Sequence, residues 1–383
     1  MKVVVSVGGR FHGFNLAAEL ARRGHLHMLI TSYPAFIAAR FGVPRDKVRS
    51  VIGKEIMSRV WRLLPAPWRR RWDIDFWLAE YFDQRAAKLI PADADLFVGW
   101  SFFSLHAIRR AKELGIPTIV DHGSSHIEYQ RDILNEEYAR FGLPQPVYDE
   151  RPVQKELKEY AEADHIALGS KFAVRTFVEK GIPEKKIIRV PYGVDISSFK
   201  QTPKNDDVFR VAFAGGLTLR KGVHYLLRAF HELKLPKSEL LLVGTIHDEI
   251  RPFLAKYKKN VRAIGSVPQT ELAGLYSDSS VFVLDSVEDG FGMVIIQAMA
   301  CGLPVIASEN TGGPDIIEDG KEGFILPIRD IGKLKEKLLY LYKHPEERAK
   351  MGTAAMVKAS EGFTWQDYGE RILAAYSEVL RKA

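Results

Sequence analysis

Short apolar runs alternate along the chain with longer segments in which apolar residues recur every three or four positions. The first such unit is the run Val3–Val7, a glycine-rich turn and a helical pattern over Phe14–Arg23. The second half repeats this order with the run Arg210–Ala214, the turn Gly215–Gly222 and the helical pattern Val223–Leu233. The repetition predicts two halves that each begin as a strand, a tight turn and a helix.

Further runs of strand length are separated by helix-length segments in both halves. Those of the first half are Leu26–Ile30, Asp95–Val98, Thr118–Val120, His165–Leu168 and Ile187–Val190, and those of the second are Glu239–Val243, Val261–Ile264, Val281–Leu284, Pro304–Ala307 and Gly323–Leu326. Because strands that alternate with helices pair in parallel, the predicted fold class is α/β with two Rossmann-like domains.

A polar stretch without apolar periodicity, Lys200–Asp207, follows Pro191–Asp195 and predicts the linker between the halves. We expect a first domain over residues 1–195 and a second over residues 208–365. The last segment carries an apolar helical stripe, but its periodicity does not decide whether it packs on its own half or crosses back. A C-terminal helix over 366–383 is therefore a candidate for completing the first domain.

Composition narrows the class of protein. With 383 residues, of which 46% are hydrophobic and 27% charged, the chain fits a globular protein of two domains rather than a disordered chain or a coiled coil. Its apolar runs are far shorter than the ~18 residues that cross a bilayer. The single cysteine, Cys301, allows no internal disulfide and no multi-cysteine metal site. A cytoplasmic location is the default expectation.

Charge is concentrated near the amino terminus. Residues 1–100 carry 16 Lys and Arg against 9 Asp and Glu, which accounts for the whole formal charge of +7. Ten basic residues lie between Arg40 and Arg71, with Trp61, Trp68 and Trp72 among or beside them. Such a segment is typical of a surface for anionic partners, so residues 40–72 predict docking on an anionic membrane. The alternative is a basic helical hairpin that packs its tryptophans inward.

The two glycine turns differ in what they indicate. The first, with Gly8 and Gly9, lacks the full G-x-G-x-x-G spacing and the acid that would hold a dinucleotide ribose, so a turn without any ligand is an equal alternative. In the second turn, Arg220 and Lys221 directly precede a helix that Gly222 opens. Cations beside a helix amino terminus suit a phosphate group, although such a pair in a loop is more often only solvated.

The segment 287–307 combines a glycine loop, a helix and a glycine cap between two strands, and Asp289 and Gln297 lie eight positions apart in it. Over Gly290–Ile306 it resembles the retaining glycosyltransferases of family 4, which have the GT-B fold. The similarity extends to Pro191–Asp195 and Lys221-Gly222, and also to Thr311–Ile316. It covers essentially the whole second half, whereas the first half matches only in its glycine turn and a histidine loop.

The resemblance implies transfer of a sugar from a nucleotide-diphosphate sugar to a sugar or lipid-linked acceptor, in cell-envelope polysaccharide or glycolipid synthesis. It implies catalytic roles for Lys221 and Arg220 at the diphosphate, for Asp289 at the donor sugar and for His122 at the reacting face. The implied donor-binding residues are Gly8, Gly9, Gly215, Gly216, Gly244, Val267, Gly290, Phe291, Gly292, Gln297, Thr311, Gly312 and Gly313. No cofactor, no metal and no nucleic-acid partner are expected.

This chain departs from the family pattern at two places. Members usually carry an acid at both ends of the eight-residue spacing, whereas Gln297 is neutral here and Glu288 stands one position before Asp289. The arginine that usually follows the first glycine of the second turn is replaced by Gly216, and we expect Arg220 to substitute for it. These departures keep a catalytically idle sugar-nucleotide-binding scaffold open as an alternative. An NAD-dependent oxidoreductase is a third interpretation.

The remaining candidate residues carry weaker signals. His122 and His126 follow the run Thr118–Val120, and a capping turn opened by Ser124 or Ser125 is the structural alternative to a role in binding. Glu136 and Glu137 are interpreted as part of a solvated helix face. The two Asp-x-Asp motifs, Asp73–Asp75 and Asp93–Asp95, do not follow hydrophobic strands and are interpreted as surface features rather than a metal site.

Overall fold

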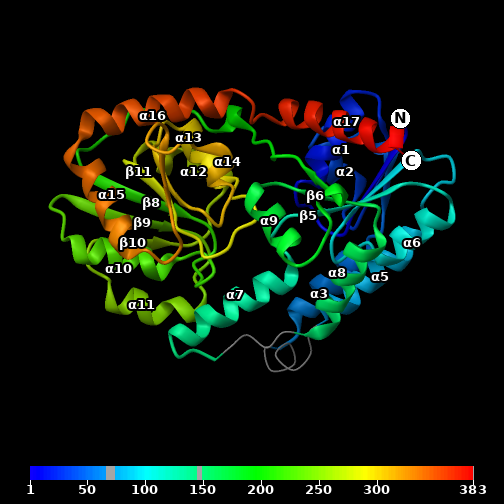
Figure 1. Cartoon of the computed structure of the whole chain (residues 1–383), viewed down its shortest axis with the longest axis horizontal. Helices are drawn as coiled ribbons and strands as arrows, with labels where there is room; N and C mark the ends of the chain where they lie inside the picture. The colour runs from blue at the N-terminus through cyan, green and yellow to red at the C-terminus, as the bar shows by residue number, and fades with distance from the viewer. Residues whose placement is uncertain (66–73, 145–148, 383) are drawn as a thin grey trace.

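The computed structural model describes residues 1–65, 74–144 and 149–382. Two parallel sheets with helices packed around them form two domains side by side, as Figure 1 shows. This confirms the α/β fold with two Rossmann-like domains that the sequence predicts. Asp73, Trp68 and Trp72 lie outside the described residues, as do Arg69, Arg70 and Arg71.

The first sheet has the strand order β3-β2-β1-β4-β5-β6-β7, with every pair parallel. Its strands are β1 (Val3–Val7), β2 (Leu26–Thr31), β3 (Val48–Ser50), β4 (Leu96–Trp100), β5 (Thr118–His122), β6 (His165–Leu168) and β7 (Ile187–Arg189). Its helices are α1 (Gly13–Arg22), α2 (Ala35–Ala39), α3 (Gly53–Leu63), α5 (Asp75–Ala87), α6 (Leu105–Glu113), α7 (Ile127–Arg140), α8 (Glu150–Glu162) and α9 (Lys171–Glu179). Sequence patterns missed β3, because Val48–Ser50 contains a single apolar residue, whereas the equally short β7 begins with two isoleucines.

The second sheet has the order β10-β9-β8-β11-β12-β13, again all parallel. Its strands are β8 (Phe209–Ala214), β9 (Ser238–Val243), β10 (Val261–Ile264), β11 (Val281–Leu284), β12 (Val305–Ser308) and β13 (Gly323–Leu326). Its helices are α10 (Val223–Leu233), α11 (Arg251–Lys256), α12 (Gln269–Ser277), α13 (Val294–Ala300), α14 (Gly313–Ile316), α15 (Ile331–Lys343) and α16 (Pro345–Ser360). Strands β8 to β10 are added toward one edge of the sheet and β11 to β13 toward the other, so the strand order reverses between β8 and β11. Ligands of open α/β sheets bind at such switch points.

The carboxyl-terminal helix α17 (Trp365–Lys382) crosses back to the first domain and lies beside α1 in Figure 1. Arg23 Nη2 donates a hydrogen bond of 2.9 Å to the carbonyl of Gln366. At the crossing, Val194 N donates to the carbonyl of Phe363 at 2.8 Å. The chain therefore passes twice between the domains at one place, and both termini lie on the first domain. Among the described helices, none has the length and apolar content needed to span a bilayer.

Helix α7 belongs to the first domain but reaches the second one (Figure 1). Its residues Ile133 and Leu134 are buried with Tyr225 and Val287 of the second domain. Glu137, interpreted from sequence as part of a solvated face, is instead completely buried between His224 and Arg329. The expectation is wrong because the sequence shows only the period of α7 itself, whereas the cover on this face comes from a domain far along the chain.

Candidate active site

Two loops meet at the switch point of the second sheet, the turn after β8 and the loop after β11. Val287 N donates a hydrogen bond of 2.9 Å to the carbonyl of Arg220. Gly222 has φ of +69°, and a Cβ there would lie 1.7 Å from the carbonyl oxygen of Asp285. Only glycine fits this contact, because it tolerates a positive φ and has no side chain. Gly222 thus allows the two loops to press together and brings Arg220, Lys221 and the 285–292 loop into one site.

The two cations of the turn each pair with a carboxylate of the loop. Arg220 Nη1 lies 2.8 Å from Glu288 Oε2, and the Lys221 ammonium pairs with Asp289. Burial and the neighbouring Arg220 lower the pKa of Lys221, and the charge of Asp289 opposes that shift. The Arg220 side chain remains 34% exposed and that of Lys221 14% exposed. The pairs hold two positive groups at the switch point, where they can stabilise a phosphate-bearing ligand.

Glu288 was not among the residues expected to act at the site, yet it has the densest set of contacts there. Its carboxylate accepts hydrogen bonds from Ser124 Oγ at 2.8 Å, Ser125 N at 3.1 Å and Gln130 Nε2 at 3.0 Å, in addition to Arg220. Burial alone would raise the pKa of this completely buried group, but Arg220, Lys221 and the Ser125 amide lower it to about 2. Glu288 is therefore ionised at neutral pH. In the sequence, only its position next to Asp289 indicated that Glu288 could belong to the site.

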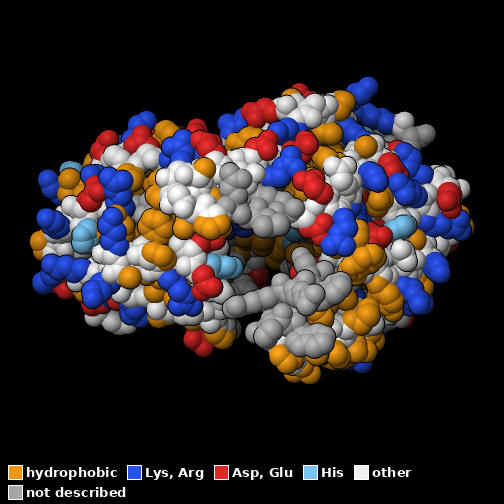
Figure 2. Space-filling model, turned by 90° about the horizontal axis from the view of Figure 1, so that it is seen from below, with side chains coloured by type: hydrophobic (Ala, Val, Ile, Leu, Met, Phe, Trp, Pro, Cys, Tyr) orange, Lys and Arg blue, Asp and Glu red, His pale blue; other side chains and the backbone are white. Residues whose placement is uncertain are grey.

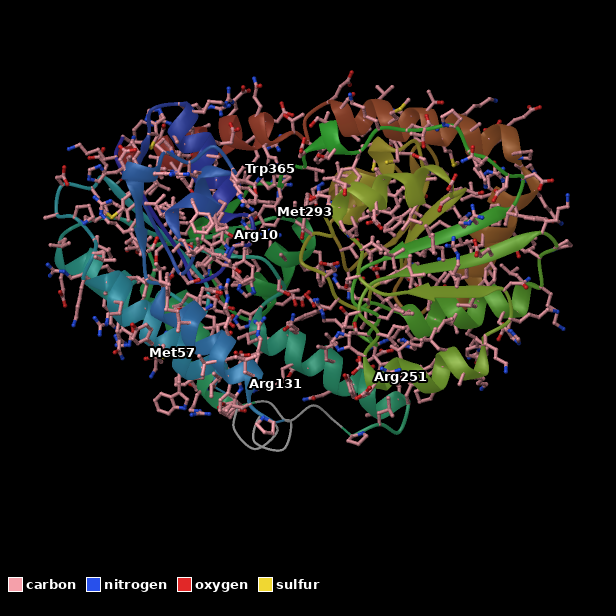
Figure 3. All side chains as sticks on the ribbon, turned by 180° about the vertical axis from the view of Figure 1, so that it is seen from behind. Arg10, Met57, Arg131, Arg251, Met293 and Trp365 are labelled. Carbon is pink, nitrogen blue, oxygen red and sulfur yellow. The ribbon has the colours of Figure 1, made fainter. Side chains whose placement is uncertain are left out.

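Backbone contacts between the domains surround this carboxylate. A Cβ on Gly290 would lie 2.2 Å from the carbonyl oxygen of Gly123, so glycine is needed there for the loops of the two domains to touch. Ser170 Oγ donates to the carbonyl of Gly290 at 2.5 Å, and the Phe291 ring packs against Tyr192 of the linker with centroids 5.1 Å apart. Figure 2 shows the molecule hollowed between the two lobes. Figure 3 places Arg10 of the first turn and Met293 near the middle, where the domains meet.

The structure places His122 at the end of β5, buried beneath that junction. Its Nε2 lies 2.9 Å from the carbonyl oxygen of Ser125 and its Nδ1 3.3 Å from Tyr160 Oη. Both ring nitrogens therefore have protein partners, and in the described part of the chain no hydrogen bond or ion pair joins the ring to Lys221 or Asp289. His126, rather than Ser124 or Ser125, caps α7 by accepting from Glu128 N. Burial, with a contribution from His122, lowers the pKa of His126 to about 4.

The other candidate donor-binding residues lie in several loops. Gln297 is half-buried on α13, five residues after Gly292. Gly244 follows β9, and Val267 follows β10. Gly8 and Gly9 stand in the first domain after β1, apart from the turn with Gly215 and Gly216. The Gly312 amide donates to the carbonyl of Phe291 and the Gly313 amide to Thr311 Oγ1, each at 2.9 Å. The Gly312 amide is thus engaged by the loop after β11, and the Gly313 amide within its own loop.

Acidic groups outside the site have other partners. Asp93 is exposed, 2.7 Å from Lys2 Nζ and 3.1 Å from His27 Nε2.

Within residues 1–65, 74–144 and 149–382, one group, Glu80, Asp83 and His106, has ligand atoms close enough for a metal ion. The Lys155 ammonium stands among its carboxylates, 2.8 Å from Asp83 Oδ2. Asp83 also accepts from the first amides of α6. This group is thus an ion pair that caps a helix.

A cavity of about 1050 Å³ lies elsewhere. It opens between the linker, the start of α16 and the residues that precede β8, β11 and β12. That is the amino-terminal edge of the second sheet, opposite the edge that carries Arg220 and Asp289. We assign the candidate site from its paired charges and its switch point rather than from cavity size.

Two parallel α/β domains, with a cation-bearing turn at the switch point of the second, define the class of two-domain GT-B proteins. Models of known protein families match both domains of the chain. Residues 8–198 match the model described as Glycosyltransferase Family 4, and residues 195–357 match the model of glycosyl transferases group 1. The chain belongs to glycosyltransferase family 4. The two models together span most of both domains, including the linker.

Individual relatives are about a quarter to a third identical to this chain over the residues that align. A Corynebacterium glutamicum protein named GDP-mannose-dependent monoacylated alpha-(1-6)-phosphatidylinositol monomannoside mannosyltransferase is 26% identical over 55% of this chain and 61% of its own length. A Corynebacterium jeikeium D-inositol 3-phosphate glycosyltransferase is 30% identical over 50% of this chain and 51% of its own length. The chain thus matches only about half to three fifths of these relatives.

Solved structures show the same fold along the whole chain. Anabaena HepE in complex with UDP and glucose superposes with a TM-score of 0.69 at 17% identity, covering 99% of this chain and all of that one. Sucrose-phosphate synthase from Thermosynechococcus elongatus has a TM-score of 0.72 at 19% identity and is covered completely, as is this chain. At such identities the likeness concerns the fold.

Proposed function

We propose that the protein transfers a sugar from a nucleotide-diphosphate sugar to an acceptor hydroxyl with retention of configuration. The observation that carries the proposal is the placement of Arg220 and Lys221, each held by a carboxylate, at the switch point of the second sheet. The family supports it, and so does the structure of HepE in complex with UDP and glucose.

The chemistry follows from the charges. When the bond between the sugar C1 and the diphosphate oxygen breaks, negative charge grows on the departing diphosphate, while a new C1–O bond forms to the acceptor. Lys221 and Arg220 stabilise that charge without requiring a metal ion. Asp289 holds Lys221 and can accept hydrogen bonds from sugar hydroxyls. Gln297, on the helix that follows the same loop, contacts the ribose in this proposal. The acceptor proton leaves with the phosphate or with water.

The test is donor turnover across a panel of nucleotide sugars, with and without acceptor. Lys221→Met keeps most of the side-chain length and removes the charge, so we expect at least ~10²-fold lower turnover. Lys321→Met is the matched control, because Lys321 is exposed and pairs with the surface residue Glu318. Proton NMR of the first product formed reports its anomeric configuration. An inverted product would contradict retention, and unchanged turnover in Lys221→Met would contradict the site.

Two specific departures favour a second candidate, a sugar-nucleotide-binding scaffold. Asp289 and Gln297 stand where the family usually carries glutamates, and Asp289 is occupied by Lys221. The same panel separates the candidates, since a scaffold binds a nucleotide sugar in calorimetry but turns over none. Binding of a nicotinamide dinucleotide in place of a nucleotide sugar would point to the oxidoreductase.

We further propose that the first domain docks on an anionic membrane on the cytoplasmic side and collects a lipid-linked acceptor there. Helices α3 and α5 form an apolar surface lined by Ile56, Met57, Val60, Trp61, Leu64, Ile74, Trp77, Leu78 and Tyr81, around a hollow of about 400 Å³. Ile56 is 57% exposed and Val60 55% exposed. Figure 2 shows apolar side chains gathered at this side, and Figure 3 marks Met57 on α3.

Charge and location both suit this docking. Helix α3 carries the basic residues Arg59 and Arg62, and also Lys54, which pairs with Glu55. Each basic residue near an anionic membrane contributes about 1 kcal/mol of attraction. The start of α3 is also tied to the first glycine turn, because Ser32 Oγ lies 2.8 Å from Glu55 Oε1 and 3.1 Å from the carbonyl oxygen of Gly8. A membrane under α3 would thus lie near the loops at the carboxyl edge of the first sheet.

Vesicle sedimentation tests the docking. We expect binding to vesicles of phosphatidylcholine with phosphatidylglycerol, weaker binding to phosphatidylcholine alone, and at least a tenfold loss in the double variant Ile56→Asp/Val60→Asp, because buried apolar area and charge both decline. Val357→Asp is the control, since Val357 is 48% exposed on α16 in the other domain. Equal sedimentation of the double variant and the control would refute the docking surface.

A further inference from the structure

One buried side chain, Glu288, joins the two domains at the candidate site. Its carboxylate comes from the loop after β11, and three of its hydrogen-bond donors, Ser124, Ser125 and Gln130, come from the first domain. The fourth, Arg220, comes from the second domain. The side chain of Glu288 has no exposed surface. It is therefore a junction between domains rather than a lining of the space between them.

The charge of this residue matters more than its shape. A carboxylate has only acceptor sites, so it can receive all four N–H and O–H groups at once. A glutamine in the same place would present an amide group to one set of donors and leave them unpaired. Unpaired buried donors are costly, and bonds to a charged partner are stronger than neutral ones. The ionised state of Glu288 is thus required for the junction to close.

Arg220 connects this junction to the proposed chemistry. One guanidinium nitrogen, Nη1, is held by Glu288, and the side chain is still one third exposed. A guanidinium has five donors in a rigid fork, so one edge can bind Glu288 while another edge meets a diphosphate. Asp289 also attracts Arg220. Without Glu288, we expect the guanidinium to turn toward Asp289 and to disturb its pair with Lys221.

We propose that Glu288 is a positioning residue that couples closure of the two domains to the orientation of the Arg220 guanidinium at the donor diphosphate. The proposal rests on the sugar-transfer function above and deepens it. Glu288 does not touch the reacting atoms in this account; it acts through Arg220 and through the 124–130 segment of the first domain. Its removal should therefore affect the departing diphosphate more than binding of the intact donor.

The first experiment compares Glu288→Gln with the wild-type chain. We expect kcat for sugar transfer to fall at least ~10-fold, donor KM to stay within about threefold, and affinity for free nucleoside diphosphate to fall about tenfold, on the scale of one lost charge-assisted bond. Hydrogen exchange of the peptide that contains the Ser125 amide should accelerate about tenfold, since that amide loses its acceptor. Glu318→Gln is the matched control, as Glu318 is exposed and pairs with Lys321 on the surface.

The second variant, Ser124→Ala/Gln130→Ala, removes side-chain donors of the first domain but leaves the pair between Glu288 and Arg220. It should accelerate exchange and lower kcat while diphosphate affinity stays within about twofold. It also covers the case in which Glu288→Gln does not fold. The positioning role would be overturned if Glu288→Gln showed the same amide hydrogen exchange and the same kcat as the wild-type chain. It would also be overturned if amide exchange were faster while kcat stayed unchanged. An equal loss of diphosphate affinity in both variants would do the same.

Failure of the proposed function is distinguishable from failure of this inference. If the wild-type chain turns over no nucleotide sugar, the proposed sugar transfer is wrong. Amide hydrogen exchange and the affinity for nucleoside diphosphate then still decide the role of Glu288. Loss of affinity only in Glu288→Gln, with faster exchange in both variants, supports the coupling. Unchanged affinity in Glu288→Gln overturns it.

Discussion

Asp285 at the end of β11 offers a quantitative test of how the loop after that strand is held. Its side chain is buried, and neither carboxylate oxygen has a hydrogen-bond partner among the described residues. Burial, reinforced by the charges of Asp330 and Glu137, raises the pKa of Asp285 from 3.8 to about 7. The folded protein therefore prefers the protonated form. Asp285→Asn, which mimics that form in shape and lacks a charge, should be more stable than the wild-type chain.

The sign and size follow from proton linkage. Below pH 4 both states of the wild-type chain bind the proton, so the raised pKa has no effect on the free energy of unfolding. As the pH rises toward 7, the unfolded state ionises first and stability falls, reaching a full penalty above pH 7. A shift of about three pKa units corresponds to about 4 kcal/mol at pH 8 and about 2 kcal/mol at pH 5. The advantage of Asp285→Asn should follow these values.

Calorimetry of the two proteins between pH 5 and pH 8 measures this advantage as a difference in Tm of the second domain. About 4 kcal/mol at pH 8 corresponds to roughly 10 °C for a domain of this size, and the difference should halve at pH 5. Asp248→Asn is the control, because the Asp248 side chain is 96% exposed and should shift stability by less than about 0.5 kcal/mol. A difference that is the same at both pH values, or that grows toward pH 5, would refute the reasoning.

The site supports three further predictions. Gln297→Ala should raise donor KM roughly tenfold and leave kcat nearly unchanged, since the amide offers one neutral hydrogen bond to a part of the donor that does not react. Steady-state kinetics measure both constants, and a larger effect on kcat than on KM would contradict the ribose assignment. Asp289→Asn should depress kcat more than it raises KM, because the Lys221 ammonium loses its charged partner at the diphosphate; equal changes would remove Asp289 from the reacting end. Activity should survive dialysis against EDTA, and strict dependence on added Mg²⁺ or Mn²⁺ would refute charge stabilisation by Arg220 and Lys221 alone.

Local patterns were sufficient for most of the framework. The runs Val3–Val7, Val261–Ile264 and Val281–Leu284 are strands with the predicted bounds, because buried parallel strands are continuously apolar and glycine or polar turns end them. The helical period located α10 equally well. The pairing of Lys221 with Asp289 was not visible in this way, although both residues were candidates, since 68 positions of chain separate them.

What the sequence alone determined is the order of strands and helices, the two α/β domains, the family and the cation-bearing turn. The tertiary structure decided which side chains the other domain covers. Glu137 has the character of a solvated residue until His224 and Arg329 close over it, and Glu288 is one acid among several until Ser124, Ser125 and Gln130 converge on it. His122 Nδ1 has a partner only because α8 brings Tyr160 to the end of β5, whereas the Nε2 partner, Ser125, is three residues along the chain. The physical reason is that burial and charge pairing depend on distance in space, whereas a periodic pattern reports only neighbours along one strand or helix.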